Sequence, residues 1–105
     1  MAEIDSRSEE IIELSKTILS HPEPGFREVK TSRLVAAKFA HLGIPFRAGL
    51  ALTGVRGELV GGSAGPTVAL LGELDSLIVN EHPFADPQTG AAHACGHHCQ
   101  IGMLL

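Results

Sequence analysis

Apolar side chains recur every three to four positions in the first part of the chain, which is the spacing of one face of an amphipathic helix. The first such stretch predicts a helix over residues 6–20. Asp5 or Ser6 is expected to cap its N-terminus, because a side-chain oxygen there can accept an unpaired backbone N–H. Pro22 and Pro24 follow the helix and end it, since proline has no backbone N–H to donate.

A second helix is expected before the pattern changes. Its apolar positions predict that it starts near Val29, and Gly43 is expected to end it, because glycine readily adopts the left-handed backbone that follows many helices. Short apolar runs separated by glycines then predict β-strands at residues 46–48, 53–60 and 67–71. The last run is apolar on both faces, so it is expected to be buried in the centre of a sheet.

The rest of the chain combines a long connection with the start of another helix. Residues 73–92 are polar and form a longer connection than most loops, which is typical of a functional or a poorly ordered segment. Apolar residues within 101–105 predict the first turns of a buried helix. The expected fold is therefore an incomplete α/β domain: two helices, then strands of a central sheet, then the beginning of a helix.

Composition restricts the class of protein. A chain of 105 residues can form at most one compact domain. With 12 acidic and 8 basic residues the net charge is −4. The chain has no dense cluster of Lys and Arg, so a nucleic-acid partner is not expected. No apolar run approaches the roughly 18 to 20 residues that cross a bilayer, and the N-terminus lacks the apolar stretch of a signal peptide. We expect a cytoplasmic protein without a nucleic-acid or membrane partner.

The run from residue 93 to residue 99 concentrates five side chains that can bind metal ions: His93, Cys95, His97, His98 and Cys99. Thiolate and neutral imidazole both suit zinc and related divalent ions. A closed structural zinc site is a poor match, because its ligands normally come as two separated pairs. The run therefore indicates part of a metal site whose other ligands come from elsewhere. The alternative is a cluster that binds no metal specifically.

Redox chemistry is a weaker interpretation of the two cysteines. A thioredoxin-like pair needs two intervening residues, whereas three separate Cys95 from Cys99. A disulfide between them is a minor option in a cytosolic chain. A free-standing metal-binding or redox module nevertheless stays open as an alternative function.

Two acidic residues follow directly after the strongest predicted strand. Alternation along an extended chain places Glu73 and Asp75 on the same face. The carboxyl ends of strands are where open α/β sheets bind ligands. A carboxylate there could bind a metal ion or orient an imidazole ligand through its second nitrogen. The alternative is that both are solvated acids of a loop.

Three stretches together resemble the M20 metallopeptidase family, in the amidohydrolase branch that includes auxin-conjugate, hippurate and aminobenzoyl-glutamate hydrolases. They are HPEPGFRE at 21–28 followed by KTS, GPTVALLGELDSL at 65–77 and HACGHH at 93–98, of which the last is the most specific. Their order and separation also match, and the resemblance covers nearly the whole chain.

The resemblance implies a catalytic domain with a central sheet flanked by helices and a site for two divalent metal ions, which could be Zn, Mn, Co or Ni. It implies that Cys95 and His97 bind metal and that Asp75 is the catalytic aspartate behind the ligands. Glu73 takes a position that holds a ligating histidine in other branches and an aspartate in this one. The resemblance makes Glu73 an auxiliary residue of the site.

His93 and His98 are further auxiliary candidates. His98 departs from the motif, where aspartate is usual, and Gln100 stands where the branch often has another histidine. Both departures affect what surrounds the metal ligands, and with it the metal preference.

The resemblance also implies what a parent enzyme would do. Family enzymes are several times longer and carry a paired-glutamate motif, further ligands and a lid domain beyond this region. Residues 1–105 are therefore expected to be the N-terminal part of the catalytic domain, without the lid or dimerisation domain, binding few or no metal ions and inactive alone. The parent would use metal ions to hydrolyse the amide bond of N-acyl or aryl-acyl amino acids, with a small-molecule amide as its substrate. An unpaired sheet edge in such a piece would favour a homo-oligomer.

Overall fold

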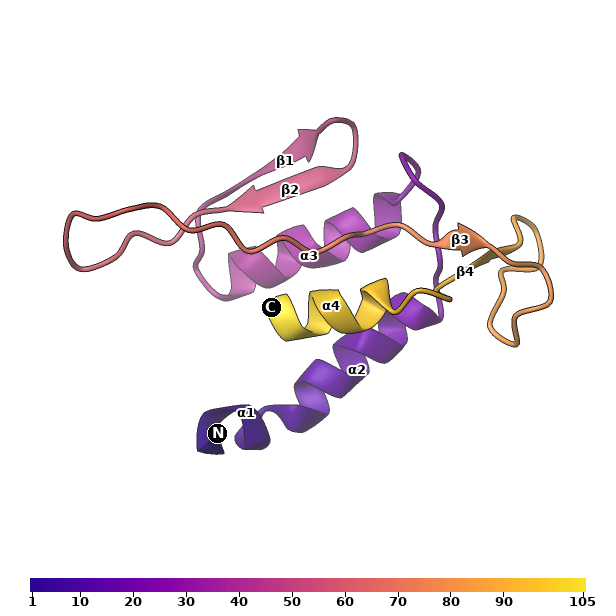
Figure 1. Cartoon of the computed structure of the whole chain (residues 1–105), viewed down its shortest axis with the longest axis horizontal. Helices are drawn as coiled ribbons and strands as arrows, with labels where there is room; N and C mark the ends of the chain where they lie inside the picture. Colours follow the sequence, from indigo (N-terminus) through magenta and orange to yellow (C-terminus); the bar gives the residue numbers. More distant parts are fainter.

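Helices and two short antiparallel ribbons make up the structure, a computed structural model that describes residues 1–105 (Figure 1). Along the chain the elements are α1 (Ala2–Ser6), α2 (Ser8–Leu19), α3 (Val29–His41), β1 (Phe46–Leu50), β2 (Gly54–Gly57), β3 (Leu77–Ile78), β4 (Ala91–Ala92) and α4 (His97–Leu104). The expected α/β class is confirmed, as is the order of helices, strands and a final helix. No helix of the structure is both long enough and apolar enough to cross a membrane.

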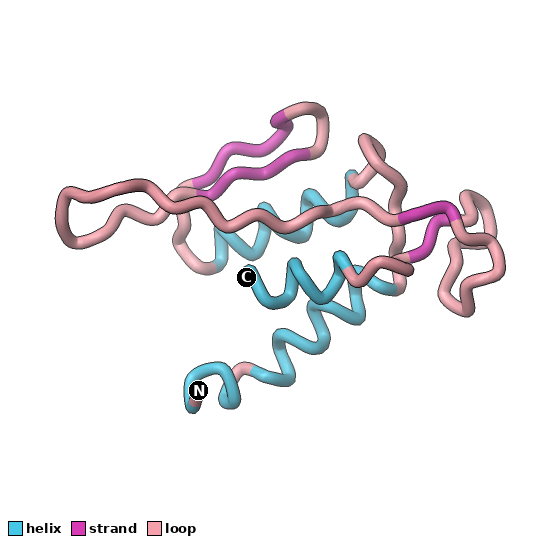
Figure 2. Tube along the Cα trace, in the orientation of Figure 1, coloured by secondary structure: helices cyan, strands magenta, loops and turns pink.

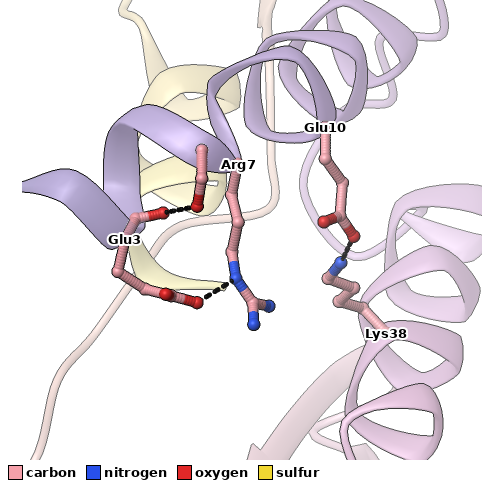
Figure 3. Close-up of polar contacts among 5 residues, drawn as sticks. Glu3, Arg7, Glu10 and Lys38 are labelled. Atoms are coloured by element: carbon pink, nitrogen blue, oxygen red, sulfur yellow. Dashed lines mark hydrogen bonds and ion pairs between the residues drawn. The ribbon is translucent and has the colours of Figure 1, made fainter.

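The first predicted helix is present, but it begins later than expected. A bend at Arg7 separates α1 from α2, so the prediction that Asp5 or Ser6 caps the helix is wrong. Both residues lie inside α1, where the Ser6 hydroxyl donates to the backbone oxygen of Glu3. Arg7 also pairs with the Glu3 carboxylate over 2.7 Å (Figure 3). An exposed pair of this kind adds little stability, because water screens it.

The core lies between the three longer helices. Its buried side chains are Ile18 of α2, Val35 and Phe39 of α3, and Ile101 of α4. On the surface an ion pair between Glu10 of α2 and Lys38 of α3 joins two of these helices (Figure 3). The helical spacing of apolar residues thus places one face of each helix against the others.

The ribbon of β1 and β2 covers the other side of α3. Phe46 pairs with Gly57, and the register shifts after Ala48 because Gly49 forms a bulge with a φ of 76°. Predicted strands at 46–48 and 53–60 are therefore both found, the first longer and the second shorter than expected. Gly43 has a φ of 68° just after α3, as its predicted role as a helix stop requires.

The prediction of a buried central strand at residues 67–71 is wrong. The segment is extended, but it pairs with no other strand and is drawn as loop in Figure 2. Its apolar side chains face solvent, and Leu71 is 91% exposed. An extended segment becomes part of a β-sheet only when its backbone forms hydrogen bonds with a neighbouring strand, and residues 67–71 have no such neighbour. The strands instead form two separate two-stranded ribbons.

The connection at 73–92 is more ordered than a solvated loop. Leu77 pairs with Ala92 and Ile78 with Ala91, so β3 and β4 close the connection into a hairpin. Just before β3, Ser76 forms a parallel bridge with Pro24, and its N–H donates to the backbone oxygen of Glu23 over 2.9 Å. The turn after α2 is thereby fixed beside the predicted site residues that precede β3.

Candidate metal-binding site

The imidazole of His97 lies between the two predicted acidic residues. Its Nε2 atom is 3.0 Å from Oε2 of Glu73. Its Nδ1 atom is 2.8 Å from the backbone oxygen of Asp75 and 3.2 Å from the Oδ1 atom of that residue. The expectation that Glu73 and Asp75 share one face is consistent with this arrangement, because both reach the same ring.

Hydrogen-bond chemistry determines which nitrogen of His97 carries a proton. A carbonyl oxygen can only accept, so Nδ1 must donate to the backbone of Asp75. Nε2 then faces the Glu73 carboxylate, which also only accepts when ionised. Two lone pairs at 3.0 Å repel each other unless a positive charge lies between them. Either a proton or a metal ion can supply that charge.

The backbone around His97 explains its position. Gly96 has a φ of 88°, a left-handed conformation that an L side chain rarely adopts, and α4 begins at the next residue. On the other side, Asp75 directly precedes Ser76, whose backbone is held by Glu23. The site therefore joins the start of α4 to the segment that leads into β3.

His93 and His98 form a second pair of imidazoles close by. Their ring centres are 5.5 Å apart, and His93 is only 4% exposed. Neither ring nitrogen of His93 has a hydrogen-bond partner, nor has Nδ1 of His98. Burial, together with the neighbouring His98 and His97, lowers the pKa of His93 to about 4. Burial, with a smaller effect of His97, also lowers the pKa of His98.

The cysteines do not take part in either arrangement. Cys95 and Cys99 are free and exposed, so the thiol that the motif assigns to metal binding lies at the surface. No group of three or more His, Cys, Asp or Glu side chains is arranged to hold a metal ion. The structure thus brings Glu73, Asp75 and His97 together and leaves Cys95 apart from them.

The donors that are present suit a divalent ion in type, although not in number. Imidazole nitrogen and carboxylate oxygen both bind zinc and related metals. The N–H of His97 that faces a backbone carbonyl is also the usual arrangement of a ligating histidine, because it fixes the ring. Further ligands are needed to complete the coordination of an ion at His97.

Sequence reasoning did not identify Glu23 as part of this region. Its side chain accepts hydrogen bonds from the N–H groups of Lys30 and Thr31 at the start of α3, and its backbone oxygen binds Ser76. Glu23 lies within the first motif stretch, 21–28, which was the available signal.

An open cavity of about 360 Å³ adjoins the site. Asp75 and Leu74 lie on its wall, together with the segment that carries Phe26 and Glu28 and the turn between β1 and β2. Glu28 is buried and its Oε2 accepts a hydrogen bond from the Thr53 hydroxyl over 2.6 Å. The site thus opens onto a hollow with both apolar and acidic walls.

Curated proteins match the chain over nearly all of its length. YhaA of Bacillus subtilis, which is named as an amidohydrolase, is 34% identical over 106 residues, which are 98% of this chain and 27% of the relative. Thermostable carboxypeptidase 1 of Saccharolobus solfataricus is 38% identical over 90% of this chain and 25% of its own length. The IAA-amino acid hydrolase ILR1-like 4 of Arabidopsis thaliana is 37% identical over 90% of this chain and 22% of its own length.

The chain spans about a quarter of the length of the curated relatives it matches. No family model and no solved structure matches it. The relatives are amidohydrolases, carboxypeptidases and IAA-amino acid hydrolases, in agreement with the resemblance carried by the three motif stretches. The chain is thus similar, over nearly all of its length, to about the first quarter of amidohydrolases and carboxypeptidases, the classes of enzyme that the resemblance to the M20 metallopeptidase family implies.

Proposed function

We propose that this chain supplies part of the metal centre of a hydrolase that cleaves the amide bond of N-acyl or aryl-acyl amino acids. The observation that carries the proposal is the position of His97, whose Nδ1 is held by Asp75 while Nε2 faces the Glu73 carboxylate. A divalent ion in place of the proton between His97 and Glu73 would satisfy both groups. The names of the relatives support the same reaction class, since all describe hydrolases.

Each site residue has a chemical role in this proposal. His97 would hold the metal ion through Nε2, and Cys95 is the further ligand that the resemblance implies. Asp75 orients His97 through the Nδ1 proton, and Glu73 balances the charge of the ion. A bound divalent ion supplies a Lewis acid and lowers the pKa of a bound water. The proposed substrate is a small-molecule amide. The two divalent ions that the resemblance to the family implies would be Zn, Mn, Co or Ni.

The remaining parts of the proposal concern the 105-residue chain itself. The general base and the further ligands of the family are not among its residues, so we propose that it does not catalyse the reaction alone. A free-standing metal-binding or redox module is not favoured, because the relatives are hydrolases. A cytoplasmic location and the formation of a homo-oligomer stay predictions.

A chimaera tests the proposal. The matching quarter of thermostable carboxypeptidase 1 is replaced by this chain, and release of amino acids from N-acyl substrates is measured with each of the four metals. We expect metal-dependent hydrolysis, and at least a 100-fold lower kcat in the Asp75→Asn chimaera. His41→Asn, at an exposed position on α3, serves as the matched control.

Two results would count against the proposal. An inactive chimaera that folds and binds metal would overturn the assignment of the site. Metal-dependent hydrolysis by the isolated 105-residue chain would overturn the statement that it is inactive alone.

A further inference from the structure

The pair of His93 and His98 has three buried ring nitrogens without any hydrogen-bond partner: both of His93 and Nδ1 of His98. A buried polar group without a partner costs about 1 to 3 kcal/mol, so such groups are rare in folded proteins. Here they occur on two neighbouring rings, of which His93 is buried and His98 is partly buried. A shared partner for both rings would remove the cost at once.

The distance between the rings fits one shared ion. The ring centres are 5.5 Å apart and the ring planes are inclined by 55°. Two imidazoles that each bind the same ion at about 2.0 to 2.1 Å hold their ring centres about 5 to 6 Å apart when the ion is tetrahedral. No direct hydrogen bond joins the two rings, so their nitrogens are free to face such an ion.

The charges around the pair favour a cation. The carboxylates of Asp75 and Glu23 both act on His93 with a negative field. Imidazole binds metal ions in its neutral form. Two partnerless imidazole rings beside these carboxylates are suited to a transition-metal ion of charge +2.

We propose that His93 and His98 bind a divalent transition-metal ion, and that His98, where the family branch has aspartate, makes this His93–His98 site prefer Ni²⁺ and Zn²⁺ over Mn²⁺. Imidazole favours the later metals, whereas a carboxylate suits Mn²⁺. That this ion lies beside a hydrolase metal centre at His97 rests on the proposed function. Binding of the ion to His93 and His98 does not itself require hydrolysis. Neither residue is at a ligand position of the family motif.

Metal affinity of the purified 105-residue chain tests the proposal. Ni²⁺, Zn²⁺ and Mn²⁺ are titrated by calorimetry into the natural chain and into the variants His93→Gln, His98→Asn and His98→Asp. We expect His93→Gln and His98→Asn each to weaken Ni²⁺ binding at least 10-fold. His98→Asp should lower the ratio of Ni²⁺ to Mn²⁺ affinity at least 10-fold, and the exposed His41→Asn should change neither.

A measurement on the unaltered chain covers the case in which a variant fails to fold. Diethyl pyrocarbonate modifies imidazole nitrogens, and mass spectrometry locates the modified histidines. We expect Ni²⁺ to protect His98 from modification while the exposed His41 stays reactive. Equal modification of His98 with and without Ni²⁺ would overturn the proposal.

The outcomes separate this proposal from the proposed function. If Ni²⁺ binding is lost in Cys95→Ser and His97→Asn but unchanged in His98→Asn, the His93–His98 site is wrong and the proposed hydrolase centre stands. If His98→Asn loses Ni²⁺ while the chimaera with thermostable carboxypeptidase 1 folds and does not hydrolyse, the proposed function is wrong and the site stands. Binding of no metal at all overturns the proposal made here.

Discussion

Glu23 shows how much one residue can organise near the site. Its Oε1 accepts from the N–H and the hydroxyl of Thr31 at 2.8 and 3.0 Å, and its Oε2 accepts from the N–H of Lys30 at 3.0 Å. These N–H groups belong to the first turn of α3, where no helical partner exists for them. The backbone oxygen of the same residue holds Ser76. Glu23 therefore links the start of a helix to the segment that carries Asp75.

Removing this carboxylate should destabilise the chain. We expect Glu23→Ala to lower the free energy of unfolding by about 1 to 2 kcal/mol, the usual range for loss of a side chain that caps a helix. Urea denaturation followed by circular dichroism measures the change. Glu81→Ala is the matched control, because Glu81 is exposed and has no hydrogen bond or ion pair. A loss for Glu23→Ala no larger than that of the control would contradict this role.

At the scale of elements, α2 and α4 pack closely against each other. Gly102 faces Ser15 so closely that a Cβ atom on Gly102 would overlap the Ser15 hydroxyl. That hydroxyl is held in place by its hydrogen bond to the backbone oxygen of Ile11 over 3.0 Å. The two helices can approach each other only because residue 102 has no side chain.

A double-mutant cycle checks this contact. We expect Gly102→Ala to cost about 1 to 2 kcal/mol of unfolding free energy, because the added methyl group overpacks the contact. Ser15→Ala removes the hydroxyl, and its Cβ stays 3.5 Å from the new methyl group, so the double variant should recover most of the loss. Thermal and urea denaturation give the coupling energy. Strictly additive effects would show that the two residues do not meet.

The elements also show what the sequence can and cannot predict. Helices α2 and α3 follow from local spacing, and the stop at Gly43 follows from one backbone preference, so both could be predicted. The run at 67–71 has strand-like residues, but a strand needs a neighbour, and no local pattern specifies one.

The same reasoning applies to the site. The residue types and the motif indicated Glu73, Asp75 and His97, because chemistry can be read from residue type and spacing. The role of Glu23 depends on a bridge between residues 24 and 76, which are far apart in sequence. The partnerless nitrogens of His93 likewise depend on packing and could not be predicted from the sequence.

At the scale of the whole molecule, the extended segment between β2 and β3 is the most exposed apolar part. The side chain of Val68 is 81% exposed and that of Leu70 is 79% exposed. The backbone of the segment pairs with no strand (Figure 2). An unpaired extended segment with apolar side chains is a template for pairing with another chain. The chain is therefore expected to self-associate through this segment.

Sedimentation velocity checks this expectation. We expect the weight-average mass of the natural chain to rise with concentration, and the double variant Val68→Lys, Leu70→Lys to stay monomeric at the same concentrations. Met103→Lys, at an exposed apolar position on α4, is the matched control and should behave as the natural chain. Equal association of all three proteins would place the contact elsewhere.

The contact of Ile18 with the rest of the core has a consequence for the order in which the chain folds during its synthesis. A ribosome makes α2 well before α4, which carries Ile101. Until then Ile18 lacks the part of the core that Ile101 supplies, and that part of the apolar face of α2 stays uncovered while about 80 further residues are added. The core therefore closes only after translation has passed Ile101.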